Sequence, residues 1–147
     1  MLKTTKFISK MKKTIVIMTK VPQAGEVKTR LQPFLTARQS AEISVCFLQD
    51  AEQKAKSVIQ NLVIAFSPFE KKNLLVDILQ SNPILIEQTG ENLGERMFHA
   101  FEFAFSQNSD AVVMIGTDSP TFPAEFIGQA FMFLETKTDA VDRKSVV

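Results

Sequence analysis

Short apolar runs along the chain alternate with longer segments in which apolar residues recur at helical spacing. The runs at residues 14–19 and 62–66 are rich in valine and isoleucine, as is typical of strands buried on both faces of a sheet. Residues 84–87 and 111–115 predict two more strands, and the last run, which is the most apolar, is expected at the sheet centre. Strands that alternate with helices predict a three-layer α/β fold with a mostly parallel sheet.

Three capping patterns between these strands indicate where helices start. Each pattern places a serine, threonine or asparagine three positions before a glutamate or glutamine, which lets side chains satisfy the free N–H groups of the first turn. The pairs are Thr36 with Gln39, Ser67 with Glu70, and Asn92 with Glu95. Pro123 is expected to open one more helix, which runs to about Glu135.

The spacing of apolar residues assigns a buried face to two of these helices. The predicted faces comprise Ala41, Val45, Leu48 and Ala55 on the first helix, and Phe98, Phe101 and Phe105 on the third. Cys46 has apolar neighbours on the first helix and is predicted to lie in the core. His99 is placed on the polar side of its helix, away from the phenylalanines.

Length and composition favour one soluble domain in a reducing compartment. A chain of 147 residues has room for one core, and a single cysteine excludes an internal disulfide and indicates the cytoplasm. The net charge of +1 gives no general reason to expect nucleic acid or an anionic membrane as a partner. No apolar run approaches the ~20 residues that a membrane span requires. Residues 1–12 form a basic N-terminal extension.

Three loops that follow predicted strands carry the polar residues most suited to chemistry. They comprise residues 20–31, 89–96 and 116–123. In an open parallel sheet, ligands bind outside the carboxyl ends of the strands, where such loops lead into helices. The sequence therefore predicts a small-molecule site at this edge of the sheet.

The first loop, K-V-P-Q-A-G-E-V-K-T-R-L, has features of a phosphate-binding segment. Gly25 allows a close approach of the backbone, while Lys28 and Arg30 can bring positive charge to a phosphate. The loop is not a P-loop, because no glycine directly precedes Lys28. A solvated basic loop is the alternative, but three cations just after a buried strand favour phosphate binding.

The third loop, I-G-T-D-S-P-T-F-P, offers a candidate metal ligand in Asp118. A lone carboxylate suits Mg²⁺, which usually takes one or two protein carboxylates together with substrate phosphates and water. The alternative is that Asp118 or Ser119 caps the next helix or an Asx turn.

The second loop places Arg96 in the first turn of a helix. A cation there opposes the helix dipole, and a bound anion could offset that cost. The alternative is a surface pairing of Glu95 with His99 four positions on.

These loops, in this order, resemble the DUF2064 family of glycosyltransferase-like proteins, often described as "selenodomain-associated transferase 1". The matching segments are K-x-P-x-x-G-x-V-K-T-R-L at residues 20–31, G-x-x-L-G-E-R-M at residues 90–97 and I-G-T-D-S-P-x-x-P at residues 115–123. The resemblance runs over residues 13–141. It implies the GT-A, or nucleotide-diphospho-sugar transferase, fold.

The resemblance also implies a function and a set of site residues. The nucleotide and its phosphates would be held by Lys20, Gly25, Lys28, Thr29, Arg30, Arg96 and Thr117, and Asp118 would bind Mg²⁺ or Mn²⁺. GT-A transferases usually carry two aspartates as D-x-D, whereas Ser119 and Pro120 follow Asp118 here. The T-D-S-P form also looks like small nucleotidyltransferases such as 2-phospholactate guanylyltransferase. A nucleotide-sugar-dependent glycosyltransferase is thus expected, with a nucleotidyltransferase acting on a phosphorylated small molecule, or a non-catalytic nucleotide-binding module, as alternatives.

The last residues of the chain depart from the family pattern. Residues 139–141 read as the start of a fifth strand, but polar residues follow at once, and D-R-K-S-V-V with a stop equals the translation of a common sequencing-adapter sequence. We hypothesise that residues 142–147 are not native and that the sheet is incomplete at the C-terminus, which would leave this fragment inactive and prone to aggregate. Resequencing the locus tests this, and a genuine genomic stop after Val147 would contradict it.

Overall fold

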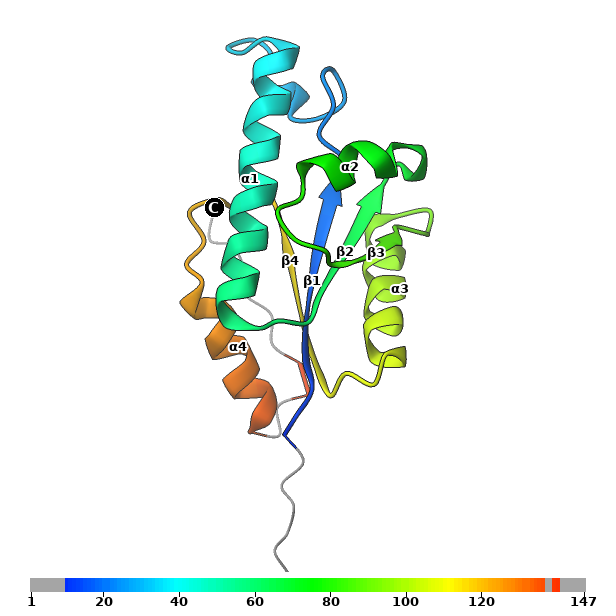
Figure 1. Cartoon of the computed structure of the whole chain (residues 1–147), viewed down its shortest axis with the longest axis vertical. Coiled ribbons are helices and arrows are strands. Elements are labelled where there is room, and N and C mark those ends of the chain that lie inside the picture. Colours follow the sequence, from blue (N-terminus) through cyan, green and yellow to red (C-terminus); the bar gives the residue numbers. More distant parts are fainter. Residues whose placement is uncertain (1–9, 137–138, 141–147) are drawn as a thin grey trace, which may run out of the picture.

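The structure is a computed structural model and describes residues 10–136 and 139–140. Strands and helices alternate along these residues (Figure 1). The strands are β1 (Lys13–Lys20), β2 (Leu62–Ser67), β3 (Ile84–Glu87) and β4 (Ala111–Gly116). The helices are α1 (Ala37–Val58), α2 (Lys72–Ile78), α3 (Leu93–Ser106) and α4 (Glu125–Glu135), with the short 3₁₀ helices η1 (Thr29–Leu31) and η2 (Phe69–Lys71) before α1 and α2.

The four strands form one parallel sheet in the order β3-β2-β1-β4. The predicted α/β class, the parallel sheet and the positions of the first four predicted strands are confirmed. The placement of the 111–115 run at the sheet centre was wrong, since β4 is an edge strand of the described sheet and β1 and β2 lie inside it. The apolar run of β4 is explained by the helices on both of its faces rather than by two neighbouring strands, because α3 and α4 each pack against it.

Side chains of the strands alternate between two cores, one on each face of the sheet. Ile15 and Ile17 of β1 pack with Leu48 of α1 and Phe131 of α4, while Val16 packs on the other face with alanines of α3. Helices α1, α2 and α4 therefore cover one face and α3 covers the other, which gives the three layers expected from the sequence.

Helix α1 begins at the expected capping box, and its predicted buried face is confirmed at Leu48 and Ala55 only. The Thr36 side chain accepts a hydrogen bond from the Gln39 N–H, and the Gln39 side chain accepts one from the Thr36 N–H. Its buried residues are Ser40, Ser44, Leu48, Ala51, Glu52 and Ala55. Ala41 and Val45 are only half-buried, and Cys46 is exposed, so the core position predicted for Cys46 was wrong. Cys46 lies two positions from Leu48, about 200° around the helix.

Helix α3 packs on the sheet mainly through small residues, with Phe101 of the predicted face half-buried against the same core. Asn92 caps it as expected by accepting from the Glu95 N–H. Ala100 and Ala104 are buried, whereas Phe98 is 59% and Phe105 is 49% exposed. The predicted buried phenylalanine face was therefore wrong for these two residues.

The capping box predicted at Ser67 does not form. Ser67 is the last residue of β2, and its carbonyl accepts a hydrogen bond from the N–H of Val21. Pro68 then takes the capping position of η2 and makes no side-chain cap. Strand pairing to the β1 end thus holds Ser67 in the sheet.

Several expectations fall on residues that the structure does not describe. Val141, with which the fifth strand would continue, and the tail at residues 142–147 both lie outside the described residues, as does most of the N-terminal extension. None of the helices in the described part combines the length and apolar character that crossing a bilayer requires.

Candidate functional site

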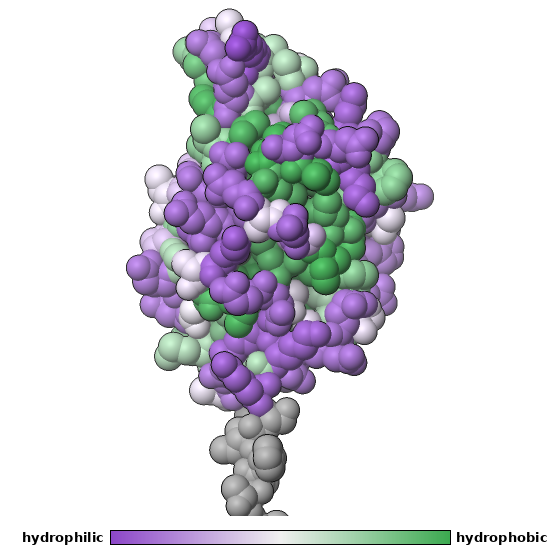
Figure 2. Space-filling view, viewed as in Figure 1, coloured by the Kyte–Doolittle hydropathy of each residue, from purple (hydrophilic) through white to green (hydrophobic). Residues whose placement is uncertain are grey.

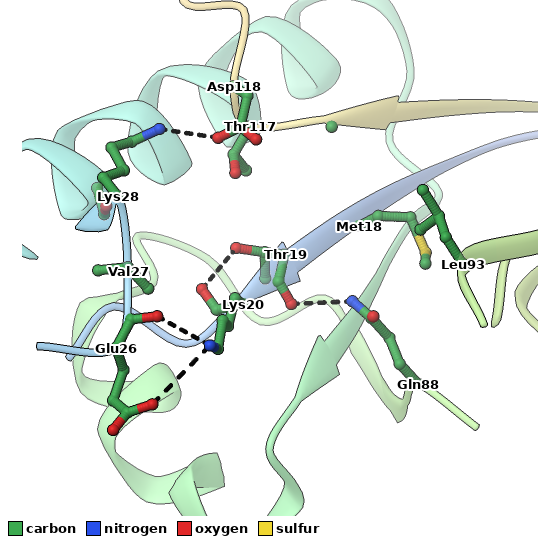
Figure 3. Close-up of a pocket in the computed structure, with 12 residues that line it drawn as sticks. Met18, Thr19, Lys20, Glu26, Val27, Lys28, Gln88, Leu93, Thr117 and Asp118 are labelled. Atoms are coloured by element: carbon green, nitrogen blue, oxygen red, sulfur yellow. Dashed lines mark hydrogen bonds and ion pairs between the residues drawn. The ribbon is translucent and has the colours of Figure 1, made fainter. Parts of the chain in front are cut away.

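A cleft of about 380 Å³ opens at the carboxyl edge of the sheet. Its walls come from the ends of β1 and β4, from the loop after β1, from Gln88 just beyond β3 and from the start of α3 (Figure 3). The volume lies in the range of small-ligand sites, about 300–1,000 Å³. In an open parallel sheet, ligands bind outside the carboxyl ends of the strands, which we call the strand-end rule. The cleft lies at this place.

Lys28 is the most tightly held cation in the cleft. Its backbone is in the left-handed region, with φ 49°, directly before η1. Its ammonium lies 2.8 Å from Oδ1 of Asp118 and 4.4 Å from the ring centroid of Phe47 on α1. The side chain is only 14% exposed. The geometry therefore fixes one positive charge between the β1 loop and the end of β4.

Asp118 is the open partner of this ion pair. It follows β4 after Thr117, its side chain is 90% exposed, and both residues line the cleft. Among the described residues there is no group of three or more His, Cys, Asp or Glu side chains that could enclose a metal ion. The donor set fits a Mg²⁺ that brings its own phosphate and water ligands, which needs only one or two protein carboxylates.

Lys20 supplies a second positive charge at the end of β1. Its ammonium donates a hydrogen bond of 2.8 Å to the carbonyl of Glu26 and lies 3.9 Å from the carboxylate of the same residue. Gly25 stands just before in the turn with φ 81°, a conformation that glycine adopts without strain. The turn at Gly25 folds the loop back over Lys20, so both lysines of the cleft have a carboxylate within 4 Å.

The cleft brings together only part of the residue set expected from the sequence. Lys20, Lys28, Thr117 and Asp118 line it. Thr29 and Arg30 are exposed on η1, next to Lys28 but outside the lining.

Arg96 also lies outside the cleft lining. Its Nε donates to the carbonyl of Gly90 at 3.0 Å, which ties the first turn of α3 to the loop before it. The surface pair of Glu95 with His99 is not formed, since Glu95 accepts from the Glu91 N–H and a ring nitrogen of His99 lies 2.8 Å from the carbonyl of Thr89.

Sequence reasoning missed several residues of this site, among them Met18, Gln88 and Leu93 in the lining and Phe47 beside Lys28. Gln88 directly follows β3, so the strand-end rule could have indicated it. Phe47 lies in the middle of α1, and its contact with the Lys28 ammonium had no signal in the sequence, because it depends on how the loop packs against the helix.

The fold and the cleft together define an α/β protein with a charged cleft at the carboxyl edge of a parallel sheet. Residues 34–142 match the model of the family described as "Uncharacterized protein conserved in bacteria (DUF2064)". The chain belongs to this family, as the motifs of its loops indicated. The match begins after residues 20–31, so the first loop lies outside it. No curated protein matches the chain.

One solved structure with the same fold comes from Desulfovibrio desulfuricans G20 and is a protein proposed to be a nucleotide-diphospho-sugar transferase. It is 30% identical to the chain, with a TM-score of 0.79 over 86% of the chain. The chain spans 55% of the length of that protein. The expected nucleotide-diphospho-sugar transferase fold is thereby confirmed.

Proposed function

We propose that the chain is the nucleotide-binding part of a nucleotide-sugar-dependent glycosyltransferase of the cytoplasm. The observation that carries this proposal is the pairing of Lys28 with Asp118 at 2.8 Å in a cleft at the strand ends. Transfer of a sugar from a nucleotide diphosphate leaves charge on the phosphates, and a fixed cation there stabilises the leaving group. The likeness to a protein proposed to be a nucleotide-diphospho-sugar transferase supports the same ligand class.

In this proposal Lys28 contacts the diphosphate and Lys20 adds a second charge at the end of β1. Thr117 lines the cleft beside them and is suited to donate a hydroxyl to a phosphate oxygen. Arg30 and Arg96 lie outside the lining, so each reaches the phosphates only if its side chain turns toward the cleft.

Asp118 is the proposed ligand of Mg²⁺ or Mn²⁺. The metal would neutralise charge on the phosphates as the nucleotide leaves. For Asp118 to bind it, Lys28 has to exchange the carboxylate for a phosphate oxygen, which keeps each charge paired throughout.

Thermal-shift and calorimetric titrations of the chain test the proposal. UDP, GDP, dTDP and CDP, their sugar conjugates and the free triphosphates are titrated with and without Mg²⁺ or Mn²⁺. A nucleotide diphosphate or its sugar should raise the melting temperature. Lys28→Ala should weaken binding about tenfold or more, since hydrogen bonds to charged groups contribute about 1.5–3 kcal/mol. Asp118→Asn should remove any metal enhancement.

Lys72→Ala is the matched control, because this lysine is exposed on α2, away from the cleft lining. Binding of free triphosphates alone would support nucleotidyl transfer instead. Binding that survives both cleft substitutions, or the absence of any response, would overturn the proposed site.

A further inference from the structure

The side-chain amide of Gln88 is held in one orientation at the wall of the cleft. Its Nε2 donates to the carbonyl of Thr19 on β1 at 2.9 Å and to the carbonyl of Ala65 on β2 at 2.8 Å. Both partners are acceptors only, so a flipped amide would bring its oxygen against two carbonyl oxygens. The Gln88 N–H also donates to the Phe66 carbonyl. The amide is therefore fixed across two strand ends.

This arrangement leaves the amide oxygen, Oε1, as the available polar atom of Gln88. None of the described residues donates a hydrogen bond to it. Gln88 is half-buried and lines the cleft. Among the described residues, Oε1 is not one of the buried side-chain atoms that lack a partner, so it is open to solvent, and a donor on a ligand in the cleft can replace water there.

Apolar surface lies beside this acceptor. Met18 of β1 and Leu93 at the start of α3 line the same cleft, and Leu93 is 65% exposed. Large apolar side chains that line a cleft suit a flat, largely apolar ring. Figure 3 shows Met18, Leu93 and Gln88 on one side of the cleft, and Lys28 and Asp118 on the other.

The sheet order keeps these two ends apart. Gln88 spans the ends of β1 and β2, whereas Asp118 follows β4, on the opposite side of β1. The cleft thus has a charged end and an end with apolar walls and one fixed acceptor, as a ligand with phosphates at one end and a ring at the other requires.

We propose that Gln88 determines base specificity and selects nucleotides whose base carries a ring N–H on its pairing edge, namely uracil, thymine and guanine. This inference rests on the proposed function and adds the substrate class. Cytosine and adenine present a ring nitrogen lone pair at the same place, which would face the lone pairs of Oε1. Because Nε2 is held by two carbonyls, the amide cannot rotate to offer its N–H groups instead.

The sharpest comparison uses ligands that differ only at this ring position. UDP, CDP and the N3-methylated analogue of UDP are titrated into the unmodified chain by calorimetry. UDP should bind about tenfold or more tightly than the other two, because an unmatched polar group in a half-buried site costs more than a hydrogen bond gains. GDP and dTDP should bind with affinities similar to that of UDP, and ADP should bind as weakly as CDP. Equal binding of UDP and N3-methylated UDP would overturn the proposal.

A variant tests whether Gln88 causes the preference. Gln88→Leu keeps the size of the side chain but removes the acceptor, so the UDP:CDP affinity ratio should fall to within about twofold. Gln60→Leu is the control, since Gln60 is exposed beyond α1 and should leave the ratio unchanged. Should Gln88→Leu fail to fold, the ligand series with the unmodified chain still decides the matter.

The result separates the two proposals. If no nucleotide binds, both the proposed function and the base preference are wrong. If nucleotides bind and Lys28→Ala weakens them, but UDP and CDP bind equally, only the role of Gln88 is wrong.

Discussion

Lys28 is held in place by its backbone and by two different neighbours. Its φ of 49° lies in the left-handed region, which costs a non-glycine residue about 1 kcal/mol. The Asp118 carboxylate and the Phe47 ring both contact the ammonium. Because the side chain is only 14% exposed, these contacts are less screened than those of a surface pair. A cation fixed before the ligand arrives loses little conformational freedom on binding.

Phe47→Leu tests the contribution of the ring to this arrangement. Removing the ring face takes away a cation–π contact worth about 0.5–2 kcal/mol and lets the ammonium move. Affinity for a nucleotide diphosphate, measured by calorimetry, should fall severalfold while the melting temperature changes little. Phe34→Leu is the control, since Phe34 is 87% exposed and is not part of the cleft lining. Unchanged affinity in Phe47→Leu would show that Asp118 alone positions Lys28.

Two glycines should respond in opposite ways to alanine. Gly90 has φ 131°, and a Cβ there would lie 2.7 Å from Cβ of Glu95 and 3.0 Å from the N of Arg96. Gly90→Ala should therefore lower the free energy of unfolding by about 1–3 kcal/mol. Gly128 lies inside α4, and no atom lies within 4 Å of a Cβ placed there. Gly128→Ala should therefore raise the free energy of unfolding by about 1 kcal/mol. Urea unfolding measures both, and a loss of stability in Gly128→Ala would contradict the second expectation.

At the scale of elements, Glu52 joins α1 to the connection between α2 and β3. Its side chain is 1% exposed and accepts from the Gln80 N–H at 3.0 Å and from the Ser81 hydroxyl. Glu52→Ala leaves both donors unpaired and should cost about 2–4 kcal/mol of unfolding free energy in urea. Glu52→Gln retains an acceptor oxygen and should cost less.

Glu42→Ala is the matched control for Glu52 on the same helix. Glu42 is 60% exposed and pairs with Arg38 four positions earlier, a surface contact worth about 0.5 kcal/mol or less. If Glu42→Ala lowered the free energy of unfolding as much as Glu52→Ala, the loss of stability would reflect the charge of the helix rather than the connection to β3.

The strands were predictable because each apolar run has the length and composition of a buried strand. Helix starts at Thr36 and Asn92 were predictable too, since a capping side chain acts on N–H groups within its own turn. The orientation of α3 on the sheet could not be predicted from the sequence. Whether Phe98 or Ala100 meets the sheet depends on how closely helix and sheet approach, which no local pattern records.

At the scale of the whole molecule, the sheet order assembles a cleft from residues far apart in sequence. Lys28 and Asp118 are 90 positions apart, and the strand-end rule was enough to expect them at one edge of the sheet. The rule could not tell whether Lys28 or Arg30 pairs with Asp118, because that choice depends on the left-handed backbone at Lys28. Nor could it find the contact of Gln88 with two strands.

Apolar surface on the outside of the molecule gives one further prediction. Figure 2 shows one group of apolar side chains on the face between α1 and α3, below α2, and further large apolar side chains are exposed on α3 and α4. On the helices that pack against the edge strand β4, Phe98 and Phe105 of α3 and Met132 and Phe133 of α4 are each 49–64% exposed. Large exposed apolar residues favour association, so the chain should self-associate as its concentration rises, as size-exclusion chromatography with light scattering would show.

Replacing exposed phenylalanines identifies the surface that associates. The double variant Phe98→Glu, Phe105→Glu should weaken self-association about tenfold or more, because burying a phenylalanine contributes about 1.5–3 kcal/mol, while the melting temperature changes little for such exposed positions. Val76→Glu is the control, since Val76 is 50% exposed on α2, which is not among the helices packed on β4. If Val76→Glu abolishes association and the α3 variant does not, the contact lies on the α2 face. A chain that stays monomeric at every concentration would contradict the prediction, because the exposed phenylalanines of α3 and α4 would then be tolerated in water.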